Sequence, residues 1–151
     1  RIYFLIRRSL SNDADAQDVT QHAFVRAYKS IDNFRGDSSF KTWLYRIAIN
    51  LAHNHIRDNR REQATEIGDD ELAASAVGLK RVIAIEKSEQ LKAALTALPP
   101  KQRTILELRI YDELSFREIA EIAECTENTA KVNFHHAVKK LKAIFAGSSE
   151  D

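Results

Sequence analysis

The sequence predicts an all-α protein in which two small helical domains are joined by a flexible acidic linker. The composition favours helices, because the 151 residues include only four Gly and two Pro. Charge changes in blocks along the chain: residues 1–61 carry eleven basic and six acidic side chains, residues 62–90 carry three and seven, and residues 91–151 carry nine of each. Such blocks indicate two modules with a connector between them.

Two predicted helices open the first module, which we assign to residues 1–61. Apolar residues share one face of the segment 1–10, namely Ile2, Leu5, Ile6 and Leu10. This segment is expected to be the end of an earlier helix, and since the chain has no Met, Arg1 is expected to be an internal residue of a longer protein. The second helix is Asp15–Ile31, with Asp13 or Asp15 as its cap. Its apolar face repeats every fourth residue, at Val19, Ala23, Ala27 and Ile31.

A turn at residues 33–38 contains the only Gly of this module and is followed by a third helix. We predict that the core face of this helix consists of Phe40, Trp43, Leu44, Ile47, Ala48 and Leu51. A polar stripe on another face consists of Arg46, Asn50, His53, Asn54 and Arg57. Arg and Asn hydrogen-bond base edges and phosphates, and neutral amides suit single-stranded bases as well as duplex. A solvated surface is the alternative interpretation.

Two aromatic residues of this region have different predicted roles. Trp43 lies on the apolar stripe, so we assign it to the core rather than to a base-stacking platform. Phe34 lies in the turn and is the better candidate for a base contact.

Residues 62–88 are predicted to be the linker, because they are acidic, rich in small residues and weakly periodic. A short helix within Leu72–Ile85 is expected only when a partner holds it. The acidic side chains would keep the linker off DNA and suit a basic protein channel. A solubilising spacer is the alternative.

The second module is assigned to residues 89–146, followed by a tail at 147–151. A helix is predicted from the spacing of Leu91, Leu95 and Leu98, and it must end at Pro99-Pro100. The next helix carries Ile105, Leu106, Leu108 and Ile110. Ser115 and Glu118 form a capping box before a short helix, and Thr126 caps the last one. The apolar positions of that last helix are Ala130, Phe134, Ala137, Val138, Leu141 and Phe145.

Two short helices joined by three or four residues predict a helix-turn-helix, with a structural helical hairpin as the alternative. The charges favour DNA binding. Seven acidic and two basic residues lie between Glu107 and Glu127, whereas four Lys, two His and no acidic residue lie between Asn128 and Ala146. The second helix of the pair therefore suits the major groove.

Other classes of function lack support. The pair His135-His136 points in directions about 100° apart, so it does not predict a metal site. No Gly-rich phosphate loop or nucleophile elbow occurs, so we expect neither an enzyme nor a cofactor. The single Cys125 forms no internal disulfide. No apolar run reaches the roughly 18 residues of a membrane span, so we expect a cytoplasmic protein without membrane insertion.

Several motifs carry a resemblance to a known family. Residues 18–24 (DVTQHAF) and 34–50 (FRGDSSFKTWLYRIAIN) resemble region 2 of the extracytoplasmic-function (ECF) sigma factors. Residues 98–141, including 114–120 (LSFREIA), resemble their region 4. The resemblance implies a sigma factor that binds core RNA polymerase and directs promoter recognition and opening for transcription initiation. It also implies control by an anti-sigma factor. We also expect the front of region 2 to precede Arg1.

The resemblance further assigns residues to roles. On the polymerase side, region 2 docks on the β′ clamp helices through Asp18, Gln21 and Phe24, and region 4 meets the β flap. The minus-ten element, with its flipped base, is bound by Phe34, Arg35, Gly36, Asp37, Ser38, Arg46, Asn50 and Asn54. The minus-thirty-five element is read by Arg117, Thr129, Lys131, Asn133, His135, His136 and Lys139. The sequence departs from the family at His22, where an acidic residue is common, and at Lys131, Asn133, His136 and Val138, where Arg is common.

The competing interpretation is a conventional regulator that binds an operator through its helix-turn-helix, without polymerase. Such proteins are usually dimers with a sensing or dimerising module. The first module shows neither a heptad seam nor a pocket motif, which favours the sigma interpretation.

Overall fold

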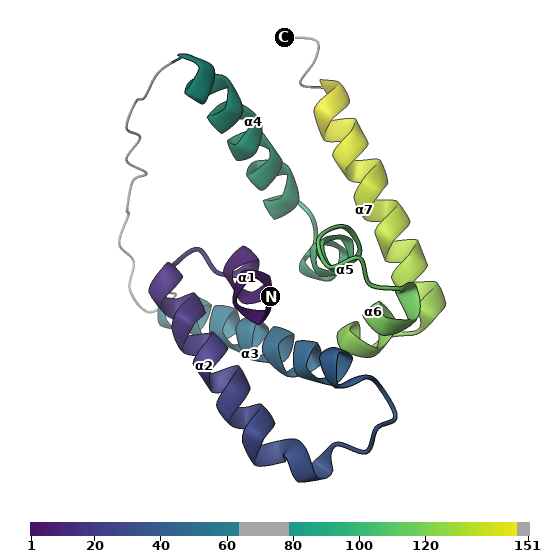
Figure 1. Cartoon of the computed structure of the whole chain (residues 1–151). Helices are drawn as coiled ribbons and strands as arrows, with labels where there is room; N and C mark the ends of the chain where they lie inside the picture. Colours follow the sequence, from purple (N-terminus) through teal and green to yellow (C-terminus); the bar gives the residue numbers. More distant parts are fainter. Residues whose placement is uncertain (64–78, 148–151) are drawn as a thin grey trace. The chain divides into compact units, whose positions relative to one another are not determined.

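The computed structural model describes residues 1–63 and 79–147, and the side chains of 1–63 and 88–147. The chain divides into two compact units, Arg1–Asp69 and Asp70–Asp151. Every regular element in the described part is a helix (Figure 1), which confirms the all-α prediction. None of the helices in these ranges has the length and apolar character that a membrane crossing requires.

The first unit contains α1 (Ile2–Ser9), α2 (Asp13–Ser30), a short 3₁₀ helix η1 (Ile31–Asn33) and α3 (Phe40–Gln63). The first three-helix core is formed by α1, α2 and α3, each of which packs against the other two. The predicted face of α1 is buried through Ile2, Leu5, Ile6 and Leu10. The buried face of α2 consists of Ala16, Val19, Ala23 and Ala27. Ile31 was expected to extend this face but is exposed, because the 3₁₀ geometry of η1 changes the direction of its side chain.

The cap of α2 differs from the prediction. Neither Asp13 nor Asp15 caps the helix; Asn12 does, and its Oδ1 accepts hydrogen bonds from the backbone N–H groups of Ala14 at 2.8 Å and Asp15 at 3.4 Å. Asp13 and Asp15 instead lie in the first turn, where their negative charge is favourable at the helix N-terminus.

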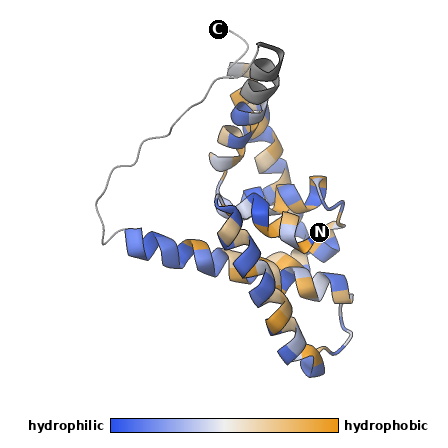
Figure 2. Cartoon of the chain, turned by 60° about the vertical axis from the view of Figure 1, so that its left-hand side comes forward, coloured by the Kyte–Doolittle hydropathy of each residue, from blue (hydrophilic) through white to orange (hydrophobic). Residues whose placement is uncertain are grey.

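The faces of α3 also differ from the prediction. Leu44 and Ala48 are buried as expected, but the rest of the core face is Thr42, Tyr45, Ile49 and Ala52. Phe40, Trp43, Ile47 and Leu51 all keep access to solvent. Trp43 and Asn50 are seven residues apart, so their side chains point within about 20° of each other. Trp43 therefore shares the polar face of α3. Figure 2 shows the C-terminal part of this helix as largely hydrophilic.

The second unit contains α4 (Leu79–Thr96), α5 (Pro100–Ile110), α6 (Phe116–Ala123) and α7 (Glu127–Gly147). Pro100 is the first residue of α5, where its missing N–H costs nothing. Ile105, Leu106, Leu108, Ile119 and Ile122 are buried between α5, α6 and α7. Leu95, Leu98, Leu106 and Ala137 form a further core cluster, against which Phe134, Val138 and Leu141 pack. Ile110, expected on the apolar face of α5, is exposed.

Helices extend into the predicted linker at 62–88, most clearly at its C-terminal end. The helix α3 runs to Gln63, and α4 begins at Leu79, well before the predicted start of the second module at residue 89. Residues 79–88 contain Lys, Arg, Leu, Ile, Ala and Glu and no Gly or Pro, so helix propensity outweighs the weak periodicity there. The N-terminal part of the possible helix at Leu72–Ile85, up to residue 78, lies outside the described residues.

Candidate nucleic-acid interface

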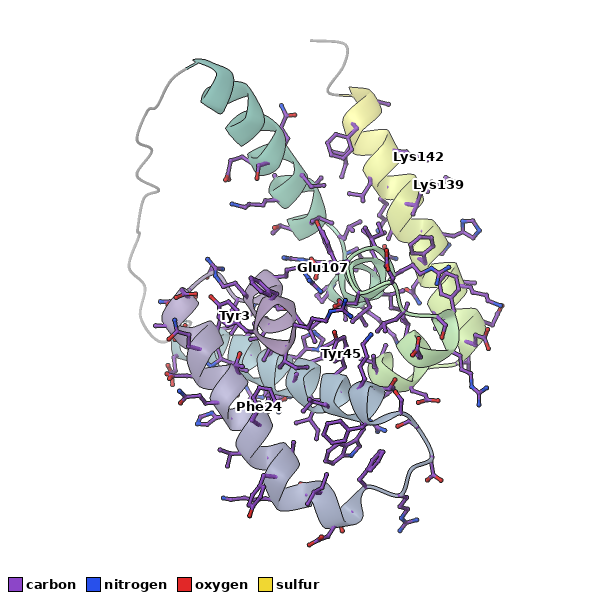
Figure 3. All side chains as sticks on the ribbon, viewed as in Figure 1. Tyr3, Phe24, Tyr45, Glu107, Lys139 and Lys142 are labelled. Atoms are coloured by element: carbon purple, nitrogen blue, oxygen red, sulfur yellow. The ribbon has the colours of Figure 1, made fainter. Side chains whose placement is uncertain are left out.

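An exposed face of α2 carries the three residues that were assigned to polymerase docking. Asp18, Gln21 and Phe24 are exposed. Asp18 and Gln21 lie on the side of α2 opposite its buried residues, and Phe24 lies at the border of the two sides. The apolar side chains of Val25 and Tyr28 extend this surface, with exposed fractions of 50% and 81%. Phe24, labelled in Figure 3, is itself 52% exposed. Exposed apolar side chains gathered on one helix face are typical of a protein-binding surface.

A cluster of three aromatic rings lies where the turn after α2 meets the start of α3. The ring of Phe34 has its centroid 5.9 Å from that of Phe40 and 5.2 Å from that of Trp43, and the last two are 5.6 Å apart. Phe40 is 49% exposed, and the other two rings are half-buried. The prediction that Trp43 belongs to the core is therefore wrong, because its ring packs in this surface cluster.

The turn between η1 and α3 is fixed at both ends. Gly36 has φ +77°, a left-handed conformation that favours glycine, although a Cβ there would meet nothing within 4 Å. Ser39 caps α3 by accepting a hydrogen bond from the Thr42 backbone N–H at 3.1 Å. Of the predicted turn residues, Arg35, Asp37 and Gly36 are exposed, and Ser38 is half-buried. The polar groups of the turn are thus presented beside the aromatic cluster.

The polar stripe of α3 continues from the aromatic cluster toward the C-terminus. Arg46, Asn50 and Asn54 are exposed, and Asn54 Oδ1 accepts a hydrogen bond from Arg57 at 3.2 Å. Desolvation lowers the pKa of His53 below its ordinary value, which favours the neutral imidazole on the same face. The structure therefore brings the predicted minus-ten residues together with Phe40 and Trp43, which were not assigned to this site. Helical geometry counted from Asn50 would have placed Trp43 on this face.

The helix-turn-helix of the second unit is held by three local hydrogen-bonded features. The predicted capping box is present: Glu118 N–H donates to Ser115 Oγ at 3.2 Å, and Ser115 N–H donates to Glu118 Oε2 at 2.8 Å. Glu124 ends α6 in the left-handed conformation, with φ 54°. Thr126 Oγ1 accepts from the Thr129 N–H at 3.1 Å and so caps α7, as predicted.

One face of α7 carries most of the residues predicted to read duplex DNA. Lys131, His135, His136 and Lys139 are exposed opposite the buried Ala130 and Ala137 (Figure 3 labels Lys139 and Lys142). Thr129 and Asn133 are half-buried at the edge of this face, and Asn133 Nδ2 donates to the Thr129 carbonyl oxygen at 2.9 Å. Arg117 is exposed on α6.

Two details of α7 bear on its chemistry. Val132 is 44% exposed in the middle of the face and was not predicted to belong to it; an apolar group there suits the methyl group of thymine. Lys131 Nζ lies 3.4 Å from Glu127 Oε1 in the first turn of α7. A DNA phosphate that binds Lys131 would have to replace this carboxylate. Among the described side chains, no three His, Cys, Asp or Glu residues gather into a possible metal site.

Comparison with known proteins matches both units separately. Residues 1–62 match the family model of sigma-70 region 2, and residues 88–141 match that of sigma-70, region 4. The chain is 36% identical to the ECF RNA polymerase sigma factor SigW of Bacillus subtilis, with 94% of this chain and 81% of that protein covered. It is 38% identical to the ECF RNA polymerase sigma-E factor of Escherichia coli, with 82% and 70% covered.

Two solved structures are similar in fold. One is the sigma factor RpoE of Bartonella quintana in complex with the anti-sigma factor NepR, with a TM-score of 0.73, 23% identity and 96% and 89% of the two chains covered. The other is CnrH in complex with the cytosolic domain of CnrY, with a TM-score of 0.70, 21% identity and 97% and 80% covered.

Proposed function

The chain belongs to the sigma-70 family of RNA polymerase sigma factors, in its ECF group, and from this premise we propose how its two units divide the work. The family matches and the curated relatives confirm the resemblance seen in the sequence. As a sigma factor, the chain binds core RNA polymerase and directs it to promoters for transcription initiation. The polymerase supplies the chemistry of RNA synthesis, and we propose that the chain itself is not an enzyme and acts in the cytoplasm.

We propose that residues 1–61 capture unpaired bases of the minus-ten element. The single observation that supports this best is the position of Trp43, which packs against the rings of Phe34 and Phe40 and lies on the side of α3 that carries the exposed Arg46 and Asn50. Aromatic rings stack on bases of any sequence, and amide and guanidinium groups hydrogen-bond the base edges and phosphates. Stacking of about 1–3 kcal/mol per base offsets the few kcal/mol needed to unpair one.

The docking of polymerase is proposed to use the exposed face of α2. Phe24 supplies apolar surface on this face, and Asp18 and Gln21 supply polar contacts. This surface is already exposed beside the packing of α2 against α1 and α3, so docking on the clamp helices can leave that packing in place.

The second unit is proposed to read the minus-thirty-five element as duplex DNA through α7. Residues 128–146 carry Lys and His and no carboxylate, so the helix can approach phosphates, while Asn133, His135 and His136 offer groups for base edges. Arg117 and Lys139 are proposed to contact the backbone and fix the register. The same unit would also contact the β flap of the polymerase.

An anti-sigma factor is proposed as the inhibitor of this chain. One structural relative is described as a sigma factor bound to an anti-sigma factor, and the other as CnrH bound to the cytosolic domain of CnrY. The exposed apolar side chains Val25 and Tyr28 offer surface that such a partner can cover. Covering it would block docking on polymerase, so the inhibitor and the polymerase would compete for α2.

The test is initiation by the full chain added to purified core polymerase on a genomic DNA library, with the start points mapped by sequencing the transcripts. We expect discrete start points that share a minus-ten and a minus-thirty-five element. The variants Phe34→Ala and Asn50→Ala should lose initiation while still binding core polymerase. Gln63→Ala on α3 and Phe4→Ala on α1 are matched controls that should keep it.

Two results would contradict the proposal. Binding to duplex DNA without association with core polymerase would favour an operator-binding regulator. Equal initiation by Asn50→Ala and Gln63→Ala would contradict the assignment of base capture to α3.

A further inference from the structure

A chain of contacts links α5 to the recognition helix α7 through one guanidinium group. Arg109, in the last turn of α5, places its guanidinium carbon 4.7 Å from the ring centroid of Phe116, the first residue of α6. The ring of Phe116 meets that of Phe134 on α7 edge-on, with the centroids 5.5 Å apart and the planes at 68°. The side chains of Arg109, Phe116 and Phe134 therefore form one continuous set of contacts across α5, α6 and α7, which we call the stack.

The same guanidinium group also fixes the loop between α5 and α6. Arg109 Nη1 donates a hydrogen bond to the Leu114 carbonyl oxygen at 2.7 Å. Leu114 is buried, and its N–H donates to the Leu108 carbonyl oxygen at 3.3 Å. Glu113 just before it has φ 53°, a left-handed conformation that is unfavourable for a residue with a side chain. Arg109 thus holds a strained loop closed at the point where α6 starts.

The far end of the stack reaches the part of α7 that sets its orientation. Phe134 packs against the core cluster of Leu95, Leu98, Leu106 and Ala137. The turn after α6 and the buried Ala130 hold the start of α7, and the core cluster holds the helix farther along. The ring of Phe116 meets Phe134 between these two places. The stack therefore adds to the packing that sets the direction of α7, and its loss allows a small change in that direction rather than release of the helix.

We propose that Arg109 is a positioning residue for promoter recognition, which orients α7 for base contacts in the major groove without touching DNA itself. The inference rests on the proposed reading of duplex DNA by α7. Bidentate base contacts need side chains held to within about 10–20° of their productive direction, whereas phosphate contacts tolerate more. Loss of the stack therefore lowers discrimination between DNA sequences more than it lowers DNA binding in general.

Lysine cannot replace arginine in this role. A guanidinium group is planar, so it lies flat on a ring while its edge donates to a carbonyl oxygen. An ammonium group keeps the charge but loses this combination. Arg109→Lys therefore removes the positioning contacts and keeps the charge. Phe116→Leu tests the same stack from the side of the ring, because leucine keeps the apolar volume and lacks the ring face.

The experiment measures binding of the holoenzyme, formed from the full chain and core polymerase, to promoter DNA and to the same DNA with the minus-thirty-five element scrambled, over a range of salt concentrations. The ratio of the two affinities should fall about three- to tenfold in Arg109→Lys, Arg109→Gln and Phe116→Leu. The dependence of binding on salt should stay as in the wild type, and the double variant Arg109→Gln/Phe116→Leu should be no worse than either single one. Lys101→Gln, on the same helix, is the control that keeps the ratio.

Three results would overturn the positioning role. If Arg109→Lys keeps the full ratio and Arg109→Gln lowers the salt slope by about one, Arg109 contacts a phosphate directly. If the variants melt earlier but keep the ratio well below their melting temperature, the stack serves stability alone. A wild-type holoenzyme that shows no preference for the minus-thirty-five element would instead overturn the proposed reading of DNA by α7, and the positioning role with it.

Discussion

Phe24→Ala is expected to weaken binding of the chain to core RNA polymerase about thirtyfold. A Phe side chain covers roughly 200 Å², so with 52% of the residue exposed, docking can bury about 100 Å² of it. Alanine retains only a small part of that surface. At about 25 cal/mol per Å², the lost burial amounts to about 2 kcal/mol. Since 1.4 kcal/mol corresponds to about a factor of ten, the dissociation constant should rise roughly thirtyfold.

The assay is competition, in which the variant displaces labelled wild-type chain from core polymerase. The half of the Phe24 ring that is buried contributes to the fold, so Phe24→Ala should also melt somewhat earlier. Binding is therefore measured well below the melting temperature found by circular dichroism. Phe4→Ala is the matched control, because Phe4 is 65% exposed on α1, away from the proposed docking face.

The reasoning fails if Phe24→Ala binds core polymerase as tightly as the wild type. It also fails if Phe4→Ala weakens binding by the same factor, because the loss would then follow from the fold rather than from the face of α2. A loss confined to Phe24→Ala identifies that face as the polymerase contact.

Three further predictions concern stability. Ser115→Ala removes the capping box of α6 and should cost the second unit about 1 kcal/mol, measured by hydrogen exchange of the α6 amides; unchanged protection would show that the cap is dispensable. Ala23→Leu, at a position with no solvent access, should cost the first unit about 1–3 kcal/mol in urea denaturation, and wild-type stability would reveal spare room between the helices. The pKa of His53 is lowered in the folded state, so its imidazole binds a proton more readily in the unfolded chain. The wild type should therefore lose stability as the pH falls below about 6.5. His53→Gln should lose less stability over that range, and equal losses would contradict a lowered pKa of His53 in the folded state.

Much of the fold could be predicted because its signals are local. The buried face of α1 follows from the spacing of Ile2, Leu5 and Ile6, and the capping box from Ser115 and Glu118 alone. The cap of α2 could not be chosen in this way, because Asn12 and Asp13 are both good caps and the difference lies in backbone conformation. The start of α4 was missed because net charge describes solvation and says little about helix propensity.

The polar residues of the candidate site and Phe34 were predicted from the sequence, whereas Phe40 and Trp43 were not. Arg46 and Asn50 stand out as polar side chains on a helix, whereas Trp43 was assigned to the core because it is apolar. The real core face of α3 contains Thr42 and Tyr45, whose polar atoms conceal it in the hydropathy pattern. When a core face includes such residues, hydropathy alone cannot locate it, and the positions of the neighbouring helices decide.

The tryptophan at the edge of this site gives the molecule an intrinsic optical signal. Trp43 is the only tryptophan of the 151 residues, and its ring lies 5.2 Å from that of Phe34 and 5.6 Å from that of Phe40. Indole emission changes in intensity and wavelength when a base stacks nearby or when water is displaced. In the isolated chain, light at the red edge of the protein absorption spectrum therefore excites Trp43 alone, which lies beside the proposed base pocket. Arrival of single-stranded DNA can thus be followed in real time on unlabelled protein.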